Sequence, residues 1–535
     1  MGDSADVLIV GAGPTGLALA AQLIAFGATV RIIDRRPTPV RESRALIVQP
    51  RTLEMLRPIG VTPALVVRGD TTASARLHLG GREVAVAMHD AGLHDTPYPF
   101  LLVIRQAETE AVLRDHLRDR GLAVEWGTEF LCRHEGSLGV TATLRHADGA
   151  EELVRASYVA GCDGSGSTVR RDAGIDFVGG AYRQSVLLAD VVISAELSAE
   201  PVHAFVSPRG GLVLFAGGEH APWRVILIRG RRSREAGPLR ADGLPPLVAT
   251  LTAGRVRVRH VAWMSDIPQQ HRLADVFRSG RVVLAGDAAH VHSPAGARGM
   301  NTGIQDACNL GWKLGLVARG VGEETLLDTY HAERRPTARL SLLLTHLIFF
   351  AEAADHPVLA RTRAALAPLV VPTAVRLAWP RRLALRMIGQ LGVGYPSGAL
   401  AIEGHPRLRR GPLPGARMPD APLRPDGMHC RLHEALATPR FHLVLCGPPQ
   451  IWDKPQLAAL KQRFDDLMDV HEVSTEFVAG GLRDPDGALL DQLGAHPNAQ
   501  YLIRPDGHVA YRSADADLAP VAQHLARWLP GASAA

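Results

Sequence analysis

The stretch Val7-Leu-Ile-Val-Gly-Ala-Gly-Pro-Thr-Gly16 joins an apolar run to a glycine-rich turn. The apolar run suits a buried parallel strand, and the glycines open the helix that follows it. Gly11 permits a tight turn, Gly13 lets the backbone approach a pyrophosphate, and Gly16 lets helix and strand pack closely. Asp34 ends the next apolar run, 18 residues beyond Gly16, where a carboxylate can accept hydrogen bonds from ribose hydroxyls. The stretch therefore predicts a dinucleotide site and does not choose between FAD and NAD.

Two later segments also place an aspartate at the end of an apolar run. In Val159-Ala-Gly-Cys-Asp163-Gly164 the run is followed by small hydroxyl residues and Arg170. This arrangement suits either support of a pyrophosphate or an ordinary strand-end turn that caps a helix. In Val282-Val-Leu-Ala-Gly286-Asp287 the carboxylate can accept hydrogen bonds from a polyol such as a ribityl chain.

The segment after Asp287 suits the edge of a flat ring. Pro294 breaks the chain, and Gly296 and Gly299 let the backbone approach a planar ligand. Met300 and Asn301 then begin a predicted helix. Free N–H groups at that helix start can stabilise negative charge on a reduced ring.

The length of 535 residues suggests about three domains. Short alternating runs between about 178 and 270 predict an antiparallel sheet inserted between two parts of a nucleotide domain. A Pro/Gly/Arg-rich connector at about 404–422 precedes a last αβ segment. We predict a first part of the nucleotide domain over 1–177, the inserted sheet over 178–272, a second part with long helices over 273–403, and a C-terminal domain over 404–535.

Composition excludes several other classes. The net charge is only +5 and the basic residues are scattered, which disfavours a nucleic-acid partner. The most apolar late stretch, Leu340 to Ala351, is too short to span a bilayer, so no membrane association is expected. The first predicted strand begins at Val7, which leaves no room for a signal peptide, and the five cysteines form no CxxC pair. We therefore expect a reduced, cytoplasmic protein without a metal site.

Taken in this order, the three motifs resemble those of the class A flavoprotein aromatic hydroxylases, the para-hydroxybenzoate and phenol hydroxylase group. The similarity is greatest to bacterial members that oxygenate aromatic polyketides. The resemblance implies an α/β fold, with a Rossmann-like FAD-binding domain interleaved with an antiparallel-sheet substrate domain and followed by a thioredoxin-like C-terminal domain. Gly415 to Asp420 and Leu502 to Gly507 resemble the opening and closing sequences of that last domain, in which Cys446 has no cysteine two residues beyond it.

The resemblance also implies noncovalent FAD, with NAD(P)H as a transient reductant. It suggests that Arg44 contacts the FAD phosphates and that Gln106 begins a helix beside the cofactor. No second complete glycine fingerprint follows a strand, so we expect NAD(P)H to bind transiently near the flavin. The expected cofactor-binding residues are Gly11, Ala12, Gly13, Pro14, Thr15, Gly16, Asp34, Arg35, Arg44, Gln106, Asp163, Gly164, Asp287, Pro294, Gly299, Met300 and Asn301.

The function that the family implies is a monooxygenase that consumes NAD(P)H and inserts one oxygen atom from O₂ into a phenolic or quinonoid polycyclic aromatic substrate. Secondary-metabolite biosynthesis, including that of polyketide antibiotics, is the expected setting, with the protein a monomer or homodimer. Baeyer–Villiger oxygenation of a polyketide ketone and flavin binding without oxygenase turnover are the alternatives. No catalytic residue is assigned; the candidates for facing the substrate are His203, Phe205, Arg209, Phe215 and Trp223.

Overall fold

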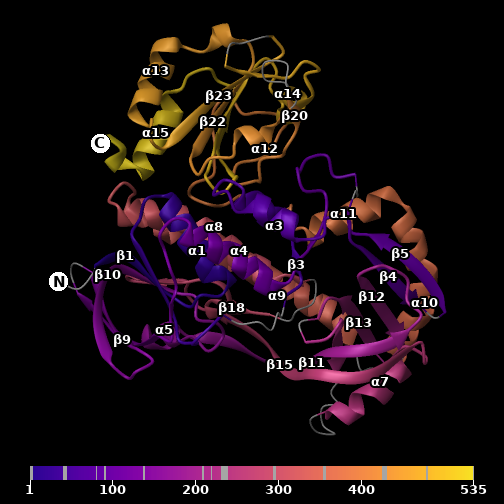
Figure 1. Ribbon diagram of the computed structural model, residues 1–535. Helices are drawn as coiled ribbons and strands as arrows, with labels where there is room; N and C mark the ends of the chain where they lie inside the picture. Colours follow the sequence, from indigo (N-terminus) through magenta and orange to yellow (C-terminus); the bar gives the residue numbers. More distant parts are fainter. Residues whose placement is uncertain are drawn as a thin grey trace.

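The computed structural model describes most of the chain. The described residues are 4–39, 45–79, 81–89, 92–136, 139–207, 210–218, 220–229, 239–292, 297–353, 357–423, 430–476 and 480–533. Their elements form three main sheets, each with its own covering helices (Figure 1).

The first sheet carries all three motifs. Its strands are β1 (Ala5–Val10), β2 (Val30–Asp34), β7 (Glu125–Trp126), β8 (Glu129–Gly136), β9 (Gly139–Arg145), β10 (Glu151–Gly161), β16 (Arg278–Ser279) and β17 (Val282–Leu284). The main path runs β16-β17-β10-β1-β2-β7, and the β8–β9 hairpin extends β10. Strands β17, β10, β1 and β2 are neighbours in parallel, as the apolar runs that precede the three motifs predict.

Helices cover this sheet and connect it to the rest of the molecule. They are α1 (Pro14–Ala25), α2 (Pro50–Leu56), α3 (Thr62–Arg68), α4 (Gln106–Arg118), α5 (Thr168–Asp172), α8 (Gly299–Ala318) and α9 (Asp328–Ala353), with the short strands β3 (Ile47–Val48) and β6 (Leu102–Val103) nearby. Helix α1 packs along α8, and the glycines of α8 allow the close approach. A Cβ atom on Gly311 would lie 2.3 Å from Cβ of Gln22.

The second sheet is mainly antiparallel. Its strands are β4 (Ser74–Leu79), β5 (Arg82–Ala87), β11 (Phe177–Ala195), β12 (Val202–Ser207), β13 (Gly210–Ala216), β14 (Trp223–Arg229), β15 (Val256–Ala274) and β18 (His290–Val291), in the order β18-β15-β11-β14-β13-β12-β4-β5. The inserted segment therefore forms the sheet that the sequence predicts. The sequence analysis did not anticipate that the β4–β5 hairpin, which comes before residue 177, joins this sheet through a parallel pairing of β4 with β12.

Helices lie on both sides of the second sheet. Figure 1 shows α7 (Leu244–Leu251) on the side away from α11 (Ala378–Ile388). Helix α10 (Pro357–Arg376) packs against α11 and contacts β4, β5 and β12. The two faces of the sheet thus meet different parts of the protein.

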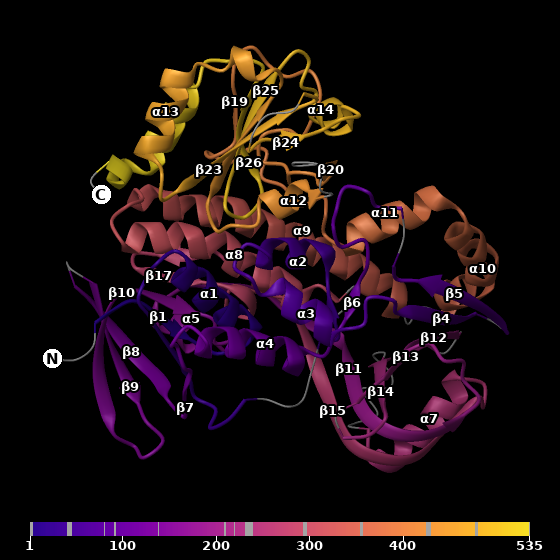
Figure 2. The same ribbon diagram turned by 45° about the horizontal axis from the view of Figure 1, so that its top comes forward.

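The C-terminal sheet has the order β19-β26-β25-β22-β23-β24 and lies over α8 and α9 (Figure 2). Its strands are β19 (Ile402–Glu403), β22 (Phe441–Cys446), β23 (Met468–Ser474), β24 (Leu482–Arg483), β25 (Ala499–Ile503) and β26 (Val509–Ser513). The helices of this region are α12 (Leu432–Ala435), α13 (Lys454–Arg463), α14 (Ala488–Leu493) and α15 (Ala519–Trp528), and β20 (Pro422–Leu423) pairs with β21 (Cys430–Arg431). The ring of Trp312 on α8 meets Phe441 edge-on at 5.4 Å, so the two cores are continuous.

Candidate functional site

The three motif turns meet at one edge of the first sheet. Because β1, β10 and β17 are neighbouring parallel strands, the turns that follow them leave the sheet on the same side. Backbone hydrogen bonds hold them together: Cys162 donates to the carbonyl of Val10 at 2.8 Å, and Ala285 donates to that of Gly161 at 3.0 Å. Such an edge is where dinucleotides bind in open α/β sheets.

The glycines of the first motif have two different surroundings. Gly11 has φ +106°, and a Cβ atom there would lie 2.4 Å from the carbonyl oxygen of Cys162. At Gly16 a Cβ atom would lie 1.9 Å from the carbonyl oxygen of Gly11. At Gly13, by contrast, no protein atom lies within 4 Å of the Cβ position, and the same holds at Gly164. Gly11 and Gly16 are needed for packing, whereas Gly13 and Gly164 border open space of the kind a pyrophosphate needs.

Asp34 is a buried carboxylate at the end of β2. It accepts a hydrogen bond from the N–H of Ala12 at 2.8 Å and a two-atom ion pair from Arg36 at 2.9 and 2.7 Å. Burial alone would raise the pKa of Asp34, but the hydrogen bonds from Arg36 and Ala12 hold that pKa below its ordinary value. Arg35, the arginine in the expected set, is exposed, and the one that orients Asp34 is Arg36.

Asp163 caps a helix. Its carboxylate accepts hydrogen bonds from the N–H groups of Thr168 at 2.7 Å and Val169 at 3.3 Å, at the start of α5. The structure thus favours capping over direct phosphate support for this carboxylate. Arg170, on the same helix, is buried and donates to the carbonyl oxygen of Ala288 at 2.8 Å, which ties the second motif to the third.

Asp287 lies in a tight turn after β17. Its side chain is exposed, whereas Gly286 and Ala288 on either side are buried. Gly286 has φ +63°, and a Cβ atom there would lie 2.5 Å from the hydroxyl of Thr15. The third turn is therefore seated against the first helix, with one carboxylate facing outward.

The remaining expected residues gather around the start of α8. Gly299 is the first residue of this helix, and Met300 follows it half-buried. The side chain of Asn301 is fully buried: it accepts from the N–H of Gln49 at 2.9 Å and donates to the carbonyl of Ile47 at 2.9 Å. Asn301 therefore holds the β3 segment against the helix start, a structural role that the sequence motif did not reveal.

Gln106 begins α4, as expected. Its amide nitrogen donates to Glu110 at 2.9 Å, and its amide oxygen accepts from the N–H of Ala45 at 3.3 Å. Gln106 is thus fixed beside the segment that follows Arg44. Arg44 itself, Pro294 and Gly296 lie outside the described residues.

The second sheet presents a partly exposed apolar face toward the first domain. Val202, Val213 and Phe215 on this face pack with residues of α11 and of the β3–β6 region. The opposite face, with Phe205 and Leu212, packs under α7. Adjacent residues alternate between faces, so His203 lies with Phe205 on the α7 side and Trp223 packs into the same cluster. Of the substrate-facing candidates, His203, Phe205 and Trp223 lie on the α7 side, Phe215 lies on the face toward the first domain, and Arg209 lies outside the described residues.

Two polar rings lie at the end of this face nearest the first domain. Tyr182 packs with Val186 and Leu188, and its ring meets His271 edge-on at 4.8 Å. Strand β18 pairs with β15 immediately beyond His271, with Arg272 opposite Val291, so this pair lies next to the segment that leads into α8. Burial raises the pKa of Tyr182. Nothing in the spacing of the sequence marked this pair.

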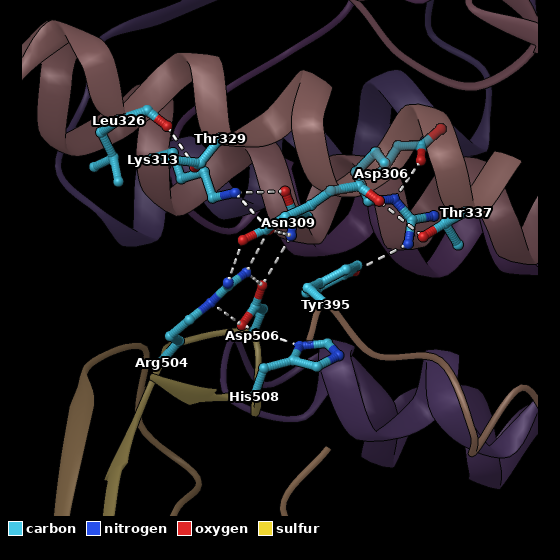
Figure 3. Close-up of polar contacts among 12 residues, drawn as sticks. Asp306, Asn309, Lys313, Leu326, Thr329, Thr337, Tyr395, Arg504, Asp506 and His508 are labelled. Atoms are coloured by element: carbon cyan, nitrogen blue, oxygen red, sulfur yellow. Dashed lines mark hydrogen bonds and ion pairs between the residues drawn. The ribbon is translucent and has the colours of Figure 1, made fainter. Parts of the chain in front are cut away.

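A buried ionic network joins α8, α9 and the C-terminal domain (Figure 3). Asp306 pairs with Arg334 at 2.7 Å and with His290 at 2.6 Å. Glu333 pairs with Lys313 at 2.7 Å and with Arg504 at 2.6 Å. Burial alone would raise the pKa of Glu333, but Arg504 and Lys313 lower it to about 2. The charges offset one another in the interior, where an unpaired ion would be costly.

The cysteines and acidic clusters suggest no further chemistry. Cys446 is fully buried, and desolvation raises the pKa of its thiol, which makes it a poor nucleophile. Within the described ranges, no three His, Cys, Asp or Glu side chains are grouped to hold a metal ion. None of the described helices combines the length and apolar character needed to cross a bilayer.

The fold and these turns define a dinucleotide-binding α/β protein, and comparison with known proteins narrows the class. A family described as "FAD binding domain" matches residues 4–343, and one described as "Aromatic-ring hydroxylase, C-terminal" matches residues 411–532. A 6-methylpretetramide 4-monooxygenase of Streptomyces rimosus is 37% identical over 534 residues, covering 95% of this chain and 90% of that protein. The chain therefore belongs to the FAD-dependent aromatic-ring hydroxylase family.

Solved structures agree with this assignment. An anhydrotetracycline hydroxylase from Streptomyces rimosus superposes with a TM-score of 0.77 at 29% identity, covering 98% of this chain and 99% of that one. An aklavinone-11 hydroxylase, solved as a ternary complex with FAD and aklavinone, gives a TM-score of 0.77 at 26% identity, with coverage of 98% and 99%. The likeness extends over all three main sheets.

Proposed function

We propose that this protein is an FAD-dependent monooxygenase that consumes NAD(P)H and inserts one oxygen atom of O₂ into a phenolic or quinonoid polycyclic aromatic substrate. The observation that carries the proposal is the position of a partly exposed apolar sheet face beside an edge where three cofactor-type turns meet. Relatives named as monooxygenases of tetracycline-type compounds support the substrate class. Secondary-metabolite biosynthesis is the setting that those names suggest.

The residues present fit FAD. The open space at Gly13 and Gly164 would accept the pyrophosphate, and Asp34 would accept from ribose hydroxyls. The outward-facing carboxylate of Asp287 would accept from the ribityl chain, and the N–H groups of Gly299 and Met300, at the start of α8, would face the flavin ring. When bound, FAD supplies the redox chemistry and the activation of O₂. The protein supplies binding, orientation and exclusion of water.

The substrate would lie between this cofactor edge and the second sheet. Val213, Phe215 and Ile226 are half-buried on the face toward the first domain and offer a flat apolar surface. An aromatic ring is attacked more readily as a phenolate, so a proton acceptor near the substrate hydroxyl assists the reaction. We infer that the imidazole of His271 provides this acceptor and that the ring of Tyr182, which it meets edge-on, orients it.

The C-terminal domain is proposed to be thioredoxin-like. Strands β22 and β23 are parallel with α13 between them, and β25 and β26 form an antiparallel pair followed by α15. The order β23-β22-β25-β26 supports that fold. The domain limits at 177, 272 and 403, a cytoplasmic location and a monomeric or homodimeric state stay predictions.

The test is oxygen incorporation under turnover. Purified protein should be yellow and release FAD, not FMN, on heat denaturation. With NADPH or NADH and a panel of polycyclic phenols, ¹⁸O₂ should place one labelled atom in the product, with tight coupling to nicotinamide oxidation. Product NMR would separate ring hydroxylation from Baeyer–Villiger ring expansion. Flavin binding without oxygen transfer to any member of the panel would contradict the proposal.

A further inference from the structure

Asp306 clamps both sides of the turn that carries Asp287. One carboxylate oxygen of Asp306 accepts from the N–H of Gly286 at 3.1 Å and lies 2.6 Å from Nε2 of His290. Gly286 precedes Asp287, and His290 follows it by three residues. The side chain of Asp306 is completely buried, so water does not compete for these contacts.

The other oxygen of Asp306 is held from α9. Arg334, itself completely buried, donates to it from Nε at 2.7 Å. The remaining guanidinium nitrogens of Arg334 donate to the hydroxyl of Tyr395 at 3.0 Å and the carbonyl of Thr302 at 3.2 Å. All three nitrogens are used, which fixes the plane of the guanidinium and hence the carboxylate that it faces.

Tyr395 extends these contacts to the C-terminal domain. Its ring lies 4.4 Å from that of His508, and the guanidinium of Arg504 lies over it at 5.3 Å (Figure 3). An uninterrupted series of buried contacts therefore runs from the C-terminal domain through Tyr395 and Arg334 to Asp306 and the Gly286–Asp287 turn.

We propose that Asp306 is a positioning residue for FAD, which fixes the Gly286–Asp287 turn, and that Arg334 and Tyr395 make this fixation depend on the docked C-terminal domain. The inference rests on the proposed function in taking Asp287 as a ribityl contact. It assigns the C-terminal domain a part in cofactor retention, although none of its residues lies in the expected FAD set.

Asp190 offers a matched control, because it is a buried carboxylate on β11 of the second sheet. It pairs with Arg224 at 2.8 Å, and its side chain is as buried as that of Asp306. Asp190→Asn and Asp306→Asn therefore each remove one buried charge from an ion pair, and only the second removes a contact with the turn. Tyr395→Phe removes only the hydroxyl that accepts from Arg334 and keeps the ring.

The experiment is FAD titration of the deflavinated full-length protein. Each variant is measured without urea, at a temperature where circular dichroism shows it to be folded. Asp306→Asn should raise the Kd for FAD by about 10-fold or more, because it removes the charged acceptor that contacts the turn directly. Tyr395→Phe should raise it by about 3- to 10-fold, because it removes one acceptor of Arg334 and so acts on the turn only through Arg334 and Asp306. Asp190→Asn should lower the unfolding midpoint and leave the Kd within about 2-fold of the original protein, because additivity holds for a distant ion pair that shares no partner with the turn. Equal losses of affinity in Asp190→Asn and Asp306→Asn would show general loosening and overturn the proposal.

Hydrogen exchange in the flavin-free protein separates this inference from the proposed function. Asp306→Asn should speed exchange of amides in 284–291, and Asp190→Asn should not. Unchanged exchange there in Asp306→Asn, or an unchanged Kd in both Asp306→Asn and Tyr395→Phe, would overturn the positioning role. If the unaltered protein fails to bind FAD while Asp306→Asn still speeds exchange, the proposed function is wrong. The inference that Asp306 fixes the Gly286–Asp287 turn would then still hold.

Discussion

Gly13 and Gly16 lie three residues apart, and a larger residue is excluded from each position for a different reason. Gly13 has φ −78° and ψ −177°, which any residue can adopt, and its Cβ position is open. Gly16 has no room for a Cβ atom. A glycine motif therefore contains positions that the fold requires and positions that the ligand requires, and substitution can distinguish them.

Gly13→Val should leave folding intact and abolish FAD retention, because the side chain would occupy the pyrophosphate space. Gly16→Ala should instead fail to give folded protein, because its Cβ would lie 1.9 Å from a carbonyl oxygen. Flavin content and the urea unfolding midpoint of purified Gly13→Val, and the yield of folded protein for Gly16→Ala, check this. Gly392→Val, at an exposed glycine with no atom within 4 Å of its Cβ position, is the control and should behave like the unaltered protein. A yellow Gly13→Val protein would contradict the placement of the pyrophosphate.

Substitutions at Asp287 and Gly299 should impair different properties of the protein. Asp287→Ala removes an acceptor for the ribityl chain, so it should weaken FAD binding by about 1.5–3 kcal/mol, the range for hydrogen bonds to charged groups. Gly299→Pro removes one N–H at the start of α8, where proline is tolerated, and disfavours the helical φ and ψ of Arg298 before it. It should keep some FAD while lowering the flavin midpoint potential, since single donors to developing negative charge are worth about 2.7–4 kcal/mol.

Dissociation constants and redox titrations on both variants provide the measurement. Asp287→Asn is the control for charge, because it keeps an acceptor of similar size. If Gly299→Pro keeps the original potential and Asp287→Ala loses no FAD, the flavin does not lie along this loop.

At the residue scale, the sequence indicates which turns carry ligand-type residues, because glycine and aspartate after apolar runs are read from local spacing. Local spacing does not identify partners that come from distant segments. Asp34 is oriented by Arg36 and not by Arg35, and the side chain of Asn301 forms its hydrogen bonds with Gln49 and Ile47. Asp306, 20 residues beyond Gly286, becomes visible only when α8 is folded back onto the third turn.

At the scale of elements, the contact between α1 and α8 decides where the cofactor edge lies. Three glycines of α8, Gly303, Gly311 and Gly315, face Thr15, Gln22 and Phe26, and Cβ atoms on them would come within 2.4, 2.3 and 2.8 Å. Because Thr15 also meets Gly286, this close packing brings the first and third motifs together. Both helices could be predicted from the sequence, but the contact between them could not, because a glycine inside a helix does not reveal which residue packs against it.

Gly311→Ala should destabilise the protein by about 1–3 kcal/mol, the usual range for overpacking a filled interior. The new methyl group would lie 2.3 Å from Cβ of Gln22, which is backbone-fixed and cannot rotate away. Urea unfolding followed by circular dichroism is the measurement, with Gly392→Ala as the control in open space. Equal midpoints for the two variants would mean that α1 and α8 do not pack as closely as described.

The second sheet shows the same limit on prediction. Alternating runs correctly indicated its strands, but they give two faces without saying which one meets the cofactor. The pairing of β12 with β4, a strand from the first 177 residues, and the cover of α7 distinguish the two faces, and they place His203 on the α7 side, away from the proposed site. Pairing between distant segments is not encoded in local periodicity.

At the scale of the whole molecule, the C-terminal domain is docked through buried charge as well as apolar contact. Arg504 of that domain pairs with Glu333 of α9 at 2.6 Å and with Asp506 of its own domain, and Arg417 pairs with Glu54 of α2 at 2.8 Å. Burial alone would raise the pKa of Glu54, but Arg417 lowers it to about 2. Such carboxylates favour the docked state only while they are ionised.

Acid should therefore weaken the protein in two successive steps. His442, His508 and His524 are buried, and desolvation lowers the pKa of each to about 4. In the unfolded chain they take up protons near their ordinary value of 6.5, so between pH 6.5 and 4 the unfolded state binds more protons and stability falls as the pH falls. Glu54 and Glu333, with pKa values of about 2 against 4.5, contribute stability that is complete above pH 4.5 and is lost toward pH 2, which is the same sign.

Urea midpoints at pH 8, 6, 5 and 4 should decline from pH 6 downward, before most carboxylates titrate. His524→Phe should flatten that decline, because the buried ring of residue 524 no longer gains a proton on unfolding. His496→Gln is the matched control: the side chain of His496 is 67% exposed and stays in water in both states, so the decline should be unchanged. A midpoint that is flat from pH 8 to pH 5 in the unaltered protein would mean that these histidines carry protons in the folded state. The buried interior of the C-terminal domain would then tolerate these charges despite the desolvation that disfavours them.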